Sequence, residues 1–271
     1  MKIAIIGGGG QMGQWLCRFL LAEGRDVIIA DRDLEKLPQV GQALGVKTAP
    51  DNITAVKQAD VVIVSVPVHL FASVIQEIGP SVRPNQIVMD VTSVKAGPVA
   101  AMREHIKVGT VLGAHPLFGP DVKKLDGQNF VLTPVGEKET ALALKVAQFL
   151  RARGANVKTM TPHAHDKMMA VVQGLSHFVA IIAADALSGL GDIQEMKDVS
   201  TTTFRIFLNY IESVIGEDAA LYAAIQMEHP EMPGIYQALT ASVAKWADMV
   251  KRKDTEAFVE SMTALKSFIG K

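Results

Sequence analysis

Cysteine is nearly absent from this chain, since Cys17 is the only one among 271 residues, and no internal disulfide can form. Charge of one sign is not in excess either, because 27 lysines and arginines balance 28 aspartates and glutamates, for a net charge of −1. That balance removes the electrostatic basis for nucleic-acid binding. The first apolar run is too short, and its charge comes too early, for a secretory signal, so we expect a cytoplasmic protein.

A long apolar run without polar interruption is also missing. The most apolar stretch, Ala170 to Leu190, contains Gln173, His177 and Asp185. Side chains of this kind are costly inside a bilayer, so the stretch predicts a buried helix of a soluble protein and not a membrane span.

The N-terminus carries the strongest motif. A short apolar run ends in glycine, a helical pattern follows, and a second apolar run ends in Asp31. Gly8-Gly9-Gly10-Gln11-Met12-Gly13 fits G-x-G-x-x-G. In such a motif the first glycine permits a tight turn, the second lets a pyrophosphate approach the backbone, and the third lets the helix pack on the strand. The helix N-terminus then offers N–H groups and a favourable dipole to the phosphates. We therefore predict a dinucleotide-binding βαβ unit.

The acid that closes the second run bears on the choice of cofactor. Asp31 lies 18 residues beyond Gly13, where a carboxylate can bind both ribose hydroxyls and repel a 2′-phosphate, which favours NAD. Arg32 follows and could instead pair with the 2′-phosphate of NADP. Pro67 after another apolar run forces the chain out near the cofactor. The predicted cofactor contacts are Gly8, Gly10, Gln11, Met12, Gly13, Asp31, Arg32, Ser65, Val66 and Pro67.

Apolar runs alternate with helical patterns up to about residue 160, which predicts an α/β Rossmann-type doubly wound, mostly parallel sheet. After Thr161-Pro162 helical patterns dominate. We predict a nucleotide-binding domain over 1–161 and an all-α domain over 162–271. The expected strands are 3–6, 27–30, 61–66, 87–90, 111–114, 130–133 and 157–160. The expected helices are 11–23, 34–44, 69–78, 95–105, 139–153, 163–189, 198–215, 218–227 and 231–269.

Polar residues follow three of the expected strands, where open α/β sheets bind ligands. His115 leaves a buried strand into a loop with Pro116, Gly119 and Pro120, a good arrangement for holding an imidazole over a cofactor. Histidine can accept a proton near neutral pH, as oxidation of an alcohol requires. Ser93 could orient that imidazole. The alternatives are a capped loop histidine and a helix N-cap serine.

Two further histidines share one long helical pattern. His165 and His177 are 12 residues apart, about 18 Å along a helix, so they cannot share a metal ion, and we predict no metal site. Gln173 precedes His177 by one turn, so the two can line one pocket. Each histidine could instead be a satisfied polar group at a domain interface.

Together, the segments GGGGQMG, SVP, DVTSVKAGP, GAHPLFGPD, HDKMMAVVQGLSHF and LYAAIQM resemble the prephenate dehydrogenase family, which includes arogenate-using members. The resemblance runs from residue 7 to about 230. It implies a Rossmann domain and a helical domain that dimerises. It also implies oxidative decarboxylation of prephenate to 4-hydroxyphenylpyruvate in tyrosine biosynthesis, with hydride transfer to NAD or NADP.

The resemblance also implies roles for individual residues. His115 would accept a hydrogen bond from the substrate hydroxyl as hydride leaves, and Ser93 would bind the same region and orient His115. His177 would line the substrate pocket, His165 would support it, and Asp121 would gate it. No decarboxylating cofactor or metal is needed, because loss of CO₂ follows from aromatisation.

One departure concerns the substrate carboxylate. Many family members have an arginine where this chain has Ser213. Arg205 lies about two helical turns earlier and could replace it, as could another cation such as Lys95. Arg205 could also be a surface residue, in which case arogenate or an amino-substituted analogue could be the substrate.

Two other functions stay open on the sequence. A β-hydroxyacid dehydrogenase or imine reductase would share the domain plan, but these enzymes typically use a helical-domain lysine. A protein that binds NAD as a sensor, without catalysis, is the alternative that is not an enzyme. The presence of both His115 and Ser93 argues against it.

Overall fold

The computed structural model describes residues 1–270 and divides them into two compact units. Unit 1 comprises Met1–Met169 together with Asp218–His229. Unit 2 comprises Ala170–Glu217 together with Pro230–Lys271. The units therefore divide the chain differently from the predicted boundary after residue 161, because unit 1 extends to Met169 and also includes Asp218–His229.

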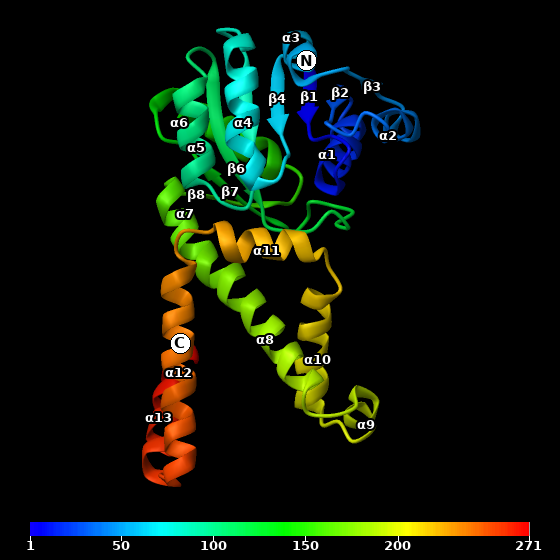
Figure 1. The fold of residues 1–271 in the computed structure, drawn as a ribbon. Coiled ribbons are helices and arrows are strands. Elements are labelled where there is room, and N and C mark those ends of the chain that lie inside the picture. Colours follow the sequence, from blue (N-terminus) through cyan, green and yellow to red (C-terminus); the bar gives the residue numbers. More distant parts are fainter. Residues whose placement is uncertain (271) are drawn as a thin grey trace. The chain divides into compact units, whose positions relative to one another are not determined.

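A single eight-stranded sheet forms the centre of unit 1 (Figure 1). The strand order is β3-β2-β1-β4-β5-β6-β7-β8, and every neighbouring pair is parallel except β6 and β7. The doubly wound, mostly parallel sheet predicted from the alternating pattern is thus confirmed. The strands are β1 (Lys2–Ile6), β2 (Asp26–Ala30), β3 (Lys47–Thr48), β4 (Val61–Val64), β5 (Ile87–Asp90), β6 (Thr110–Pro116), β7 (Asn129–Thr133) and β8 (Asn156–Thr159).

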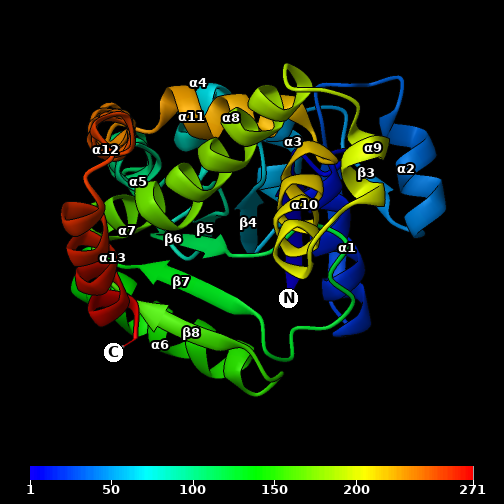
Figure 2. The ribbon, with the colours of Figure 1, turned by 90° about the horizontal axis from the view of Figure 1, so that it is seen from below.

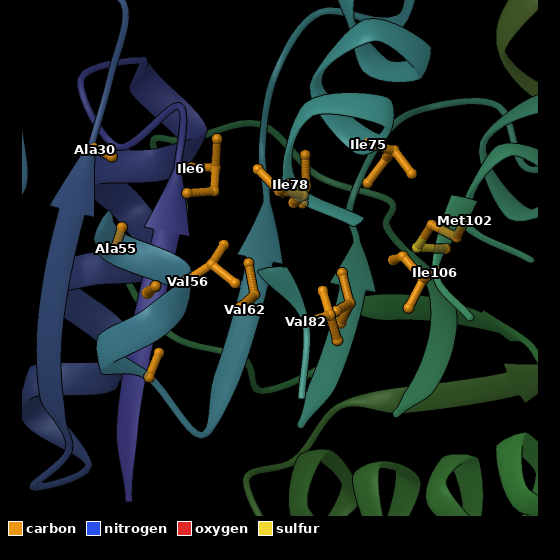
Figure 3. Packing of buried hydrophobic residues seen from close by; sticks show 14 of the residues in the cluster. Ile6, Ala30, Ala55, Val56, Val62, Ile75, Ile78, Val82, Met102 and Ile106 are labelled. Atoms are coloured by element: carbon orange, nitrogen blue, oxygen red, sulfur yellow. The ribbon is translucent and has the colours of Figure 1, made fainter. Parts of the chain in front are cut away.

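Helices cover both faces of this sheet. Apolar residues of α3, α4 and α5 pack on one face, and those of α1, α2 and α6 pack on the other. Figure 3 shows the first of these layers, in which Val56, Ile75 and Met102 meet strand residues. The unit 1 helices are α1 (Gln11–Ala22), α2 (Leu37–Leu44), α3 (Asn52–Gln58), α4 (Val68–Ile78), η1 (Gly79–Ser81), α5 (Ala96–His105), α6 (Glu137–Arg151), α7 (Pro162–Met169) and α11 (Ala219–Glu228).

The strand sequences explain this sandwich. In β1, Ala4 and Ile6 pack in one layer while Ile3 and Ile5 pack in the other, because successive side chains point to opposite faces. A strand covered on both faces must be apolar throughout, as the pattern indicated. Cys17 is completely buried in α1, and burial raises the pKa of its thiol to about 11, so it packs as an unreactive core residue.

Unit 2 is entirely helical, as predicted. It contains a π-helical turn, η2, and the helices α8, α9, α10, α12 and α13, seen in Figures 1 and 2. The helical stretch predicted over 231–269 consists of two helices, since Lys253 adopts a left-handed conformation and Asp254 caps a new helix. The bounds are η2 (Ala170–Leu175), α8 (Ser176–Ser188), α9 (Ile193–Asp198), α10 (Thr202–Ile215), α12 (Met232–Arg252) and α13 (Thr255–Ile269).

The apolar stretch at residues 170–190 is helical but not buried. Pro162–Ser188 forms a helix long and apolar enough, by length and composition, to cross a membrane, and only 17% of its most apolar window is buried within the chain. The prediction of a buried helix is therefore wrong for the single chain. Val171, Val172 and Ile182 are exposed, so this apolar surface is left for another surface to cover.

Candidate active site

A hollow at the carboxyl ends of β1, β2 and β4 is the first component of the candidate site. It is lined by Gly7, Gly9 and Gly10 of the glycine loop, by Asp31 and Arg32 after β2, and by Ser65, Val66 and Pro67 after β4. The other lining residues are Ile6, Asp33, Lys36, Asn52, Leu70 and Val74. The lining combines glycine backbone, which can approach a phosphate, with apolar side chains, which can contact an aromatic ring.

The glycines divide their roles differently from the prediction. The left-handed turn is made by Gly7, at φ +80°, and not by Gly8. Gly8 and Gly13 are needed for packing, since a Cβ at Gly8 would lie 2.6 Å from Ile29 Cβ and one at Gly13 would lie 2.8 Å from Gly8 Cα. Gly10 is the N-cap of α1 and provides no side-chain cap, which leaves the first turn of the helix for an anion.

The acid after β2 is held in the hollow by the glycine loop. Asp31 Oδ2 accepts a hydrogen bond from Gly9 N at 2.9 Å, and its Oδ1 accepts one from Asp33 N at 3.1 Å. A fixed carboxylate, a glycine cradle and an open helix N-terminus together fit a dinucleotide. Of the predicted contacts, Gly10, Asp31, Arg32, Ser65, Val66 and Pro67 line the hollow, whereas Gly8, Gln11, Met12 and Gly13 are not among its lining residues.

The second component is a buried pair of histidines. His115 stands near the end of β6, two residues beyond Gly113, which is paired with Asp90 at the end of β5. His115 Nδ1 and His165 Nε2 lie 2.8 Å apart, and the two side chains are almost fully buried. Since Nδ1 is engaged, Nε2 is the ring nitrogen of His115 left for a substrate.

The orienting partner of His115 is therefore His165, from α7, and this contact was not predicted. Ser93 was expected to orient the ring; it is half-buried on the segment between β5 and α5, and its predicted contact with a substrate hydroxyl stays a prediction. Asp121 is exposed beside a different hollow, lined by Trp15, Arg18 and Phe19, and its gating role stays a prediction as well.

A buried ion pair lies beside the histidines. Lys95 Nζ is 2.5 Å from both carboxylate oxygens of Asp90 and donates to Ala114 O at 2.8 Å, and both residues are completely buried. Burial raises the pKa of Asp90 and lowers that of Lys95, while their attraction opposes both changes. With its ammonium enclosed in this way, Lys95 is not available to a substrate carboxylate in this structure.

Asp166 connects the two groups. Its Oδ1 lies 2.8 Å from His165 Nδ1 and accepts from Lys95 N at 2.7 Å, and its Oδ2 accepts from Ala96 N at 2.8 Å. The carboxylate thus caps the start of α5 from α7. Burial alone would raise the pKa of Asp166, but the hydrogen bonds from His165, Ala96 and Lys95 outweigh it and lower the pKa.

The remaining predicted substrate residues belong to unit 2. Gln173 and His177 are half-buried in η2 and α8, and burial lowers the pKa of His177. Arg205 is exposed near the start of α10, where it donates to Ser200 O and Thr202 Oγ1, both at 3.3 Å. Their substrate contacts stay predictions. Among residues 1–270 the structure groups no three histidine, cysteine, aspartate or glutamate side chains that could hold a metal ion.

The environment of His115 predicts the pH dependence of any reaction that needs its neutral form. Burial lowers its pKa well below the ordinary value of 6.5, and the charge of Lys95 lowers it further. A lower pKa means that the ring loses its proton at lower pH, so kcat/KM should stay on its plateau at pH 6.5 and decline only below it. A profile of kcat/KM from pH 4.5 to 9 tests this, and a half-maximal value at or above pH 6.5 would contradict it.

The parallel sheet, the glycine loop and the buried His115 at the carboxyl ends of the strands define a class of protein. Its members join a Rossmann-type dinucleotide-binding domain to a helical domain. Two family models match consecutive parts of this chain. "Prephenate dehydrogenase, nucleotide-binding domain" matches residues 16–159, and "Prephenate dehydrogenase, dimerization domain" matches residues 161–264. The chain belongs to the prephenate dehydrogenase family.

Individual proteins agree with this assignment. A protein of Methanocaldococcus jannaschii, described as "Probable arogenate/prephenate dehydrogenase", is 38% identical over all of this chain, which spans 61% of that protein's length. A 4-amino-4-deoxyprephenate dehydrogenase of Streptomyces pristinaespiralis is 24% identical, over 99% of this chain and 91% of that protein. The crystal structure of prephenate dehydrogenase from A. aeolicus with hydroxyphenyl propionate and NAD+ shares the fold, with a TM-score of 0.79, 21% identity and coverage of 98% and 96% of the two chains.

Proposed function

We propose that this chain oxidises prephenate, or its amino counterpart arogenate, with hydride transfer to a nicotinamide cofactor and loss of CO₂. The observation that carries the proposal is His115. Its imidazole is buried and held through Nδ1, so that Nε2 can face a substrate, and it stands at the same sheet edge as the dinucleotide hollow. Membership of the prephenate dehydrogenase family supports the choice of substrate class.

The chemistry follows from that placement. A nicotinamide cofactor held by the glycine loop, Asp31 and the segment after β4 would supply the hydride acceptor. His115 Nε2 accepts the hydroxyl proton of the substrate as the C–H bond at the same carbon gives up its hydride. The ring carboxylate then leaves as CO₂, its bonding electrons make the ring aromatic and pass to the new carbonyl oxygen, and the resulting phenolate takes the proton back from His115 Nε2. This chain's residues therefore need only position the substrate, exclude water and hold one proton.

A single assay tests the activity and its alternatives. Formation of the reduced cofactor is followed by absorbance with each pairing of NAD or NADP with prephenate, arogenate, 4-amino-4-deoxyprephenate or a β-hydroxyacid. We expect turnover with prephenate or arogenate. Turnover only with a β-hydroxyacid would point to the other dehydrogenase class, and cofactor binding without any turnover would support a non-catalytic sensor. Either result would overturn the proposal.

The finer proposal on the cofactor is a preference for NAD. The fixed carboxylate of Asp31 lies where a 2′-phosphate would meet it, although Arg32 and Lys36 line the same hollow. Asp31→Ser should therefore shift the ratio of kcat/KM for NADP to that for NAD by about tenfold or more, equal to about 1.4 kcal/mol. Asp33→Ser, also in the lining, is the matched control and should shift it less. An unchanged ratio in Asp31→Ser would refute the role of Asp31.

The finer proposal on the substrate carboxylate concerns Arg205. The side chain is exposed and bonded only weakly to its own helix start, so its guanidinium can turn to an anion. Arg205→Gln should raise the substrate KM by about 10-fold to 100-fold with little change in kcat, since hydrogen bonds to charged groups contribute about 1.5–3 kcal/mol. Arg252→Gln, which removes an exposed cation paired with Asp248, is the control. Equal KM values in the two variants would exclude Arg205.

We also propose that the protein is a cytoplasmic homodimer formed through unit 2. The support is the match to a dimerization domain and the exposed apolar residues of the long helix. Light scattering at micromolar concentration distinguishes a dimer from a monomer, and a monomer there would refute this assembly.

A further inference from the structure

Three buried side chains form a continuous line of hydrogen bonds toward the candidate reaction centre. Asp166 Oδ1 lies 2.8 Å from His165 Nδ1, and His165 Nε2 lies 2.8 Å from His115 Nδ1. His165 is fully buried, and Asp166 and His115 are nearly so. All three belong to unit 1, and His165 and Asp166 come from one helix, α7. The line ends at His115 Nε2.

The proton positions along this line follow from Asp166. Both of its oxygens accept backbone N–H groups, from Lys95 and Ala96, so it is an acceptor at every contact. His165 must then donate from Nδ1, and a neutral His165 has only a lone pair at Nε2. That lone pair requires His115 to donate from Nδ1. The unprotonated nitrogen of His115 is consequently Nε2, the one left for the substrate.

We propose that Asp166 is a positioning residue which, through His165, fixes His115 in the tautomer that carries its proton on Nδ1 and leaves Nε2 as the proton acceptor. The catalytic consequence rests on the proposed function, whereas the tautomer does not. When Nε2 takes a proton, the imidazolium donates to His165, whose own proton stays directed at the Asp166 carboxylate. The charge of Asp166 therefore stabilises the cation without any proton leaving His165.

The neighbouring charges are consistent with this arrangement. Lys95 is paired with Asp90 on the β5 side of His115, and the carboxylate of Asp166 is the anion hydrogen-bonded to the histidine pair. Burial together with Lys95 keeps His115 neutral before the reaction, because both lower its pKa. A neutral ring with a defined tautomer is what a proton acceptor needs.

The first test measures the tautomer itself. Protein labelled with ¹⁵N in its 7 histidines is recorded in a long-range ¹H–¹⁵N spectrum, and His115 is assigned by the signals lost in His115→Gln. We expect a protonated Nδ1 and an unprotonated Nε2. A protonated Nε2 on neutral His115 would mean that His165 carries a proton on both nitrogens, and would overturn the proposal. This measurement uses no substrate, so its outcome does not depend on whether the proposed reaction is right.

The second test uses variants. His165→Gln keeps a side chain that can accept a hydrogen bond but removes the path to Asp166, while Asp166→Asn keeps the shape and removes the charge. In each we expect kcat to fall by about 10-fold to 100-fold, the range for outer partners of ligating histidines, with KM and cofactor affinity unchanged. The ¹⁵N spectrum of His165→Gln should show mixed His115 tautomers. His163→Gln, on the exposed side of α7, is the control.

The results for the two variants distinguish a positioning role of Asp166 and His165 from a role in stabilising the fold alone. Equal losses in kcat and cofactor affinity, or a tautomer unchanged in both variants, would overturn the role of Asp166. If neither variant folds, the spectrum of the unmodified protein still decides the tautomer. If the protein turns over none of the substrates, the spectrum still decides the arrangement, and only the proposed function fails.

Discussion

Replacing His115 by asparagine should lower kcat/KM by about 10²-fold to 10⁴-fold, the usual contribution of a positioned proton acceptor. Asparagine can keep a hydrogen bond to His165, but it has no basic nitrogen where Nε2 stood. The dissociation constant of the cofactor should not change, because His115 is not among the residues that line the dinucleotide hollow. Steady-state kinetics and a fluorescence titration with the cofactor measure the two quantities separately.

The matched control is His163→Asn, which changes an exposed histidine on α7 and should leave kcat/KM near that of the unmodified protein. A His115→Asn variant with kcat/KM within threefold of the original would show that the reaction does not use this imidazole. A loss of cofactor affinity as large as the loss of kcat/KM would instead show that the substitution had disturbed the fold.

Replacing Lys95 by methionine should destabilise unit 1 by about 3–5 kcal/mol, because it leaves the buried carboxylate of Asp90 without its counter-charge. For a domain of this size that corresponds to a fall in Tm of about 6–20 °C. Calorimetry and urea unfolding provide the two estimates. Lys167→Met, an exposed lysine on α7, should change the Tm by little and serves as the control.

A second substitution makes this prediction specific to the ion pair. Combining Lys95→Met with Asp90→Asn removes both charges, while the asparagine oxygen can still accept from Thr92 N and Thr92 Oγ1. The double variant should recover most of the lost stability, since replacing both partners of a buried pair costs much less than removing one. A double variant that is no more stable than Lys95→Met would show that the lost stability came from packing and not from the uncompensated charge.

The sequence predicted the sheet of unit 1 well because its strands are covered on both faces. Ile3–Ile6 and Val61–Val64 are continuous apolar runs, followed by Gly7 directly and by Pro67 after two further residues, and few other structures produce that pattern. The elements that were missed are short, namely β3, α3 and α9, and carry too few apolar residues for a period to appear. The break at Lys253 was missed because no glycine or proline marks it.

The candidate site was predictable only in part. His115 could be identified because a histidine at the end of a buried strand is unusual in a core, although β6 extends to Pro116 and so includes His115, which was predicted to follow the strand. Its hydrogen bond to His165 and the nearby charge of Lys95 could not be predicted, because they come from other segments of the chain and a sequence motif does not give tertiary distances. The sequence did contain one signal for Asp166. It directly follows His165 in the chain, so an acid was available next to a histidine already predicted to support the site.

The roles of the individual glycines in the loop could not be predicted from the sequence either. Four consecutive glycines satisfy the motif in more than one way, and only the backbone conformation shows that Gly7 makes the turn. The sequence therefore predicted that the loop binds a dinucleotide, but it did not predict the structural role of each glycine.

The return of α11 to unit 1 has a consequence for dissecting the protein. His69 on α4 and Glu228 on α11 approach to 3.4 Å, so the nucleotide-binding unit includes a segment encoded after most of unit 2. The chain passes between the units three times, and no single cut separates them. An autonomous cofactor-binding fragment would thus have to splice Asp218–His229 onto Met1–Met169 by a linker, as in the excision of an inserted domain.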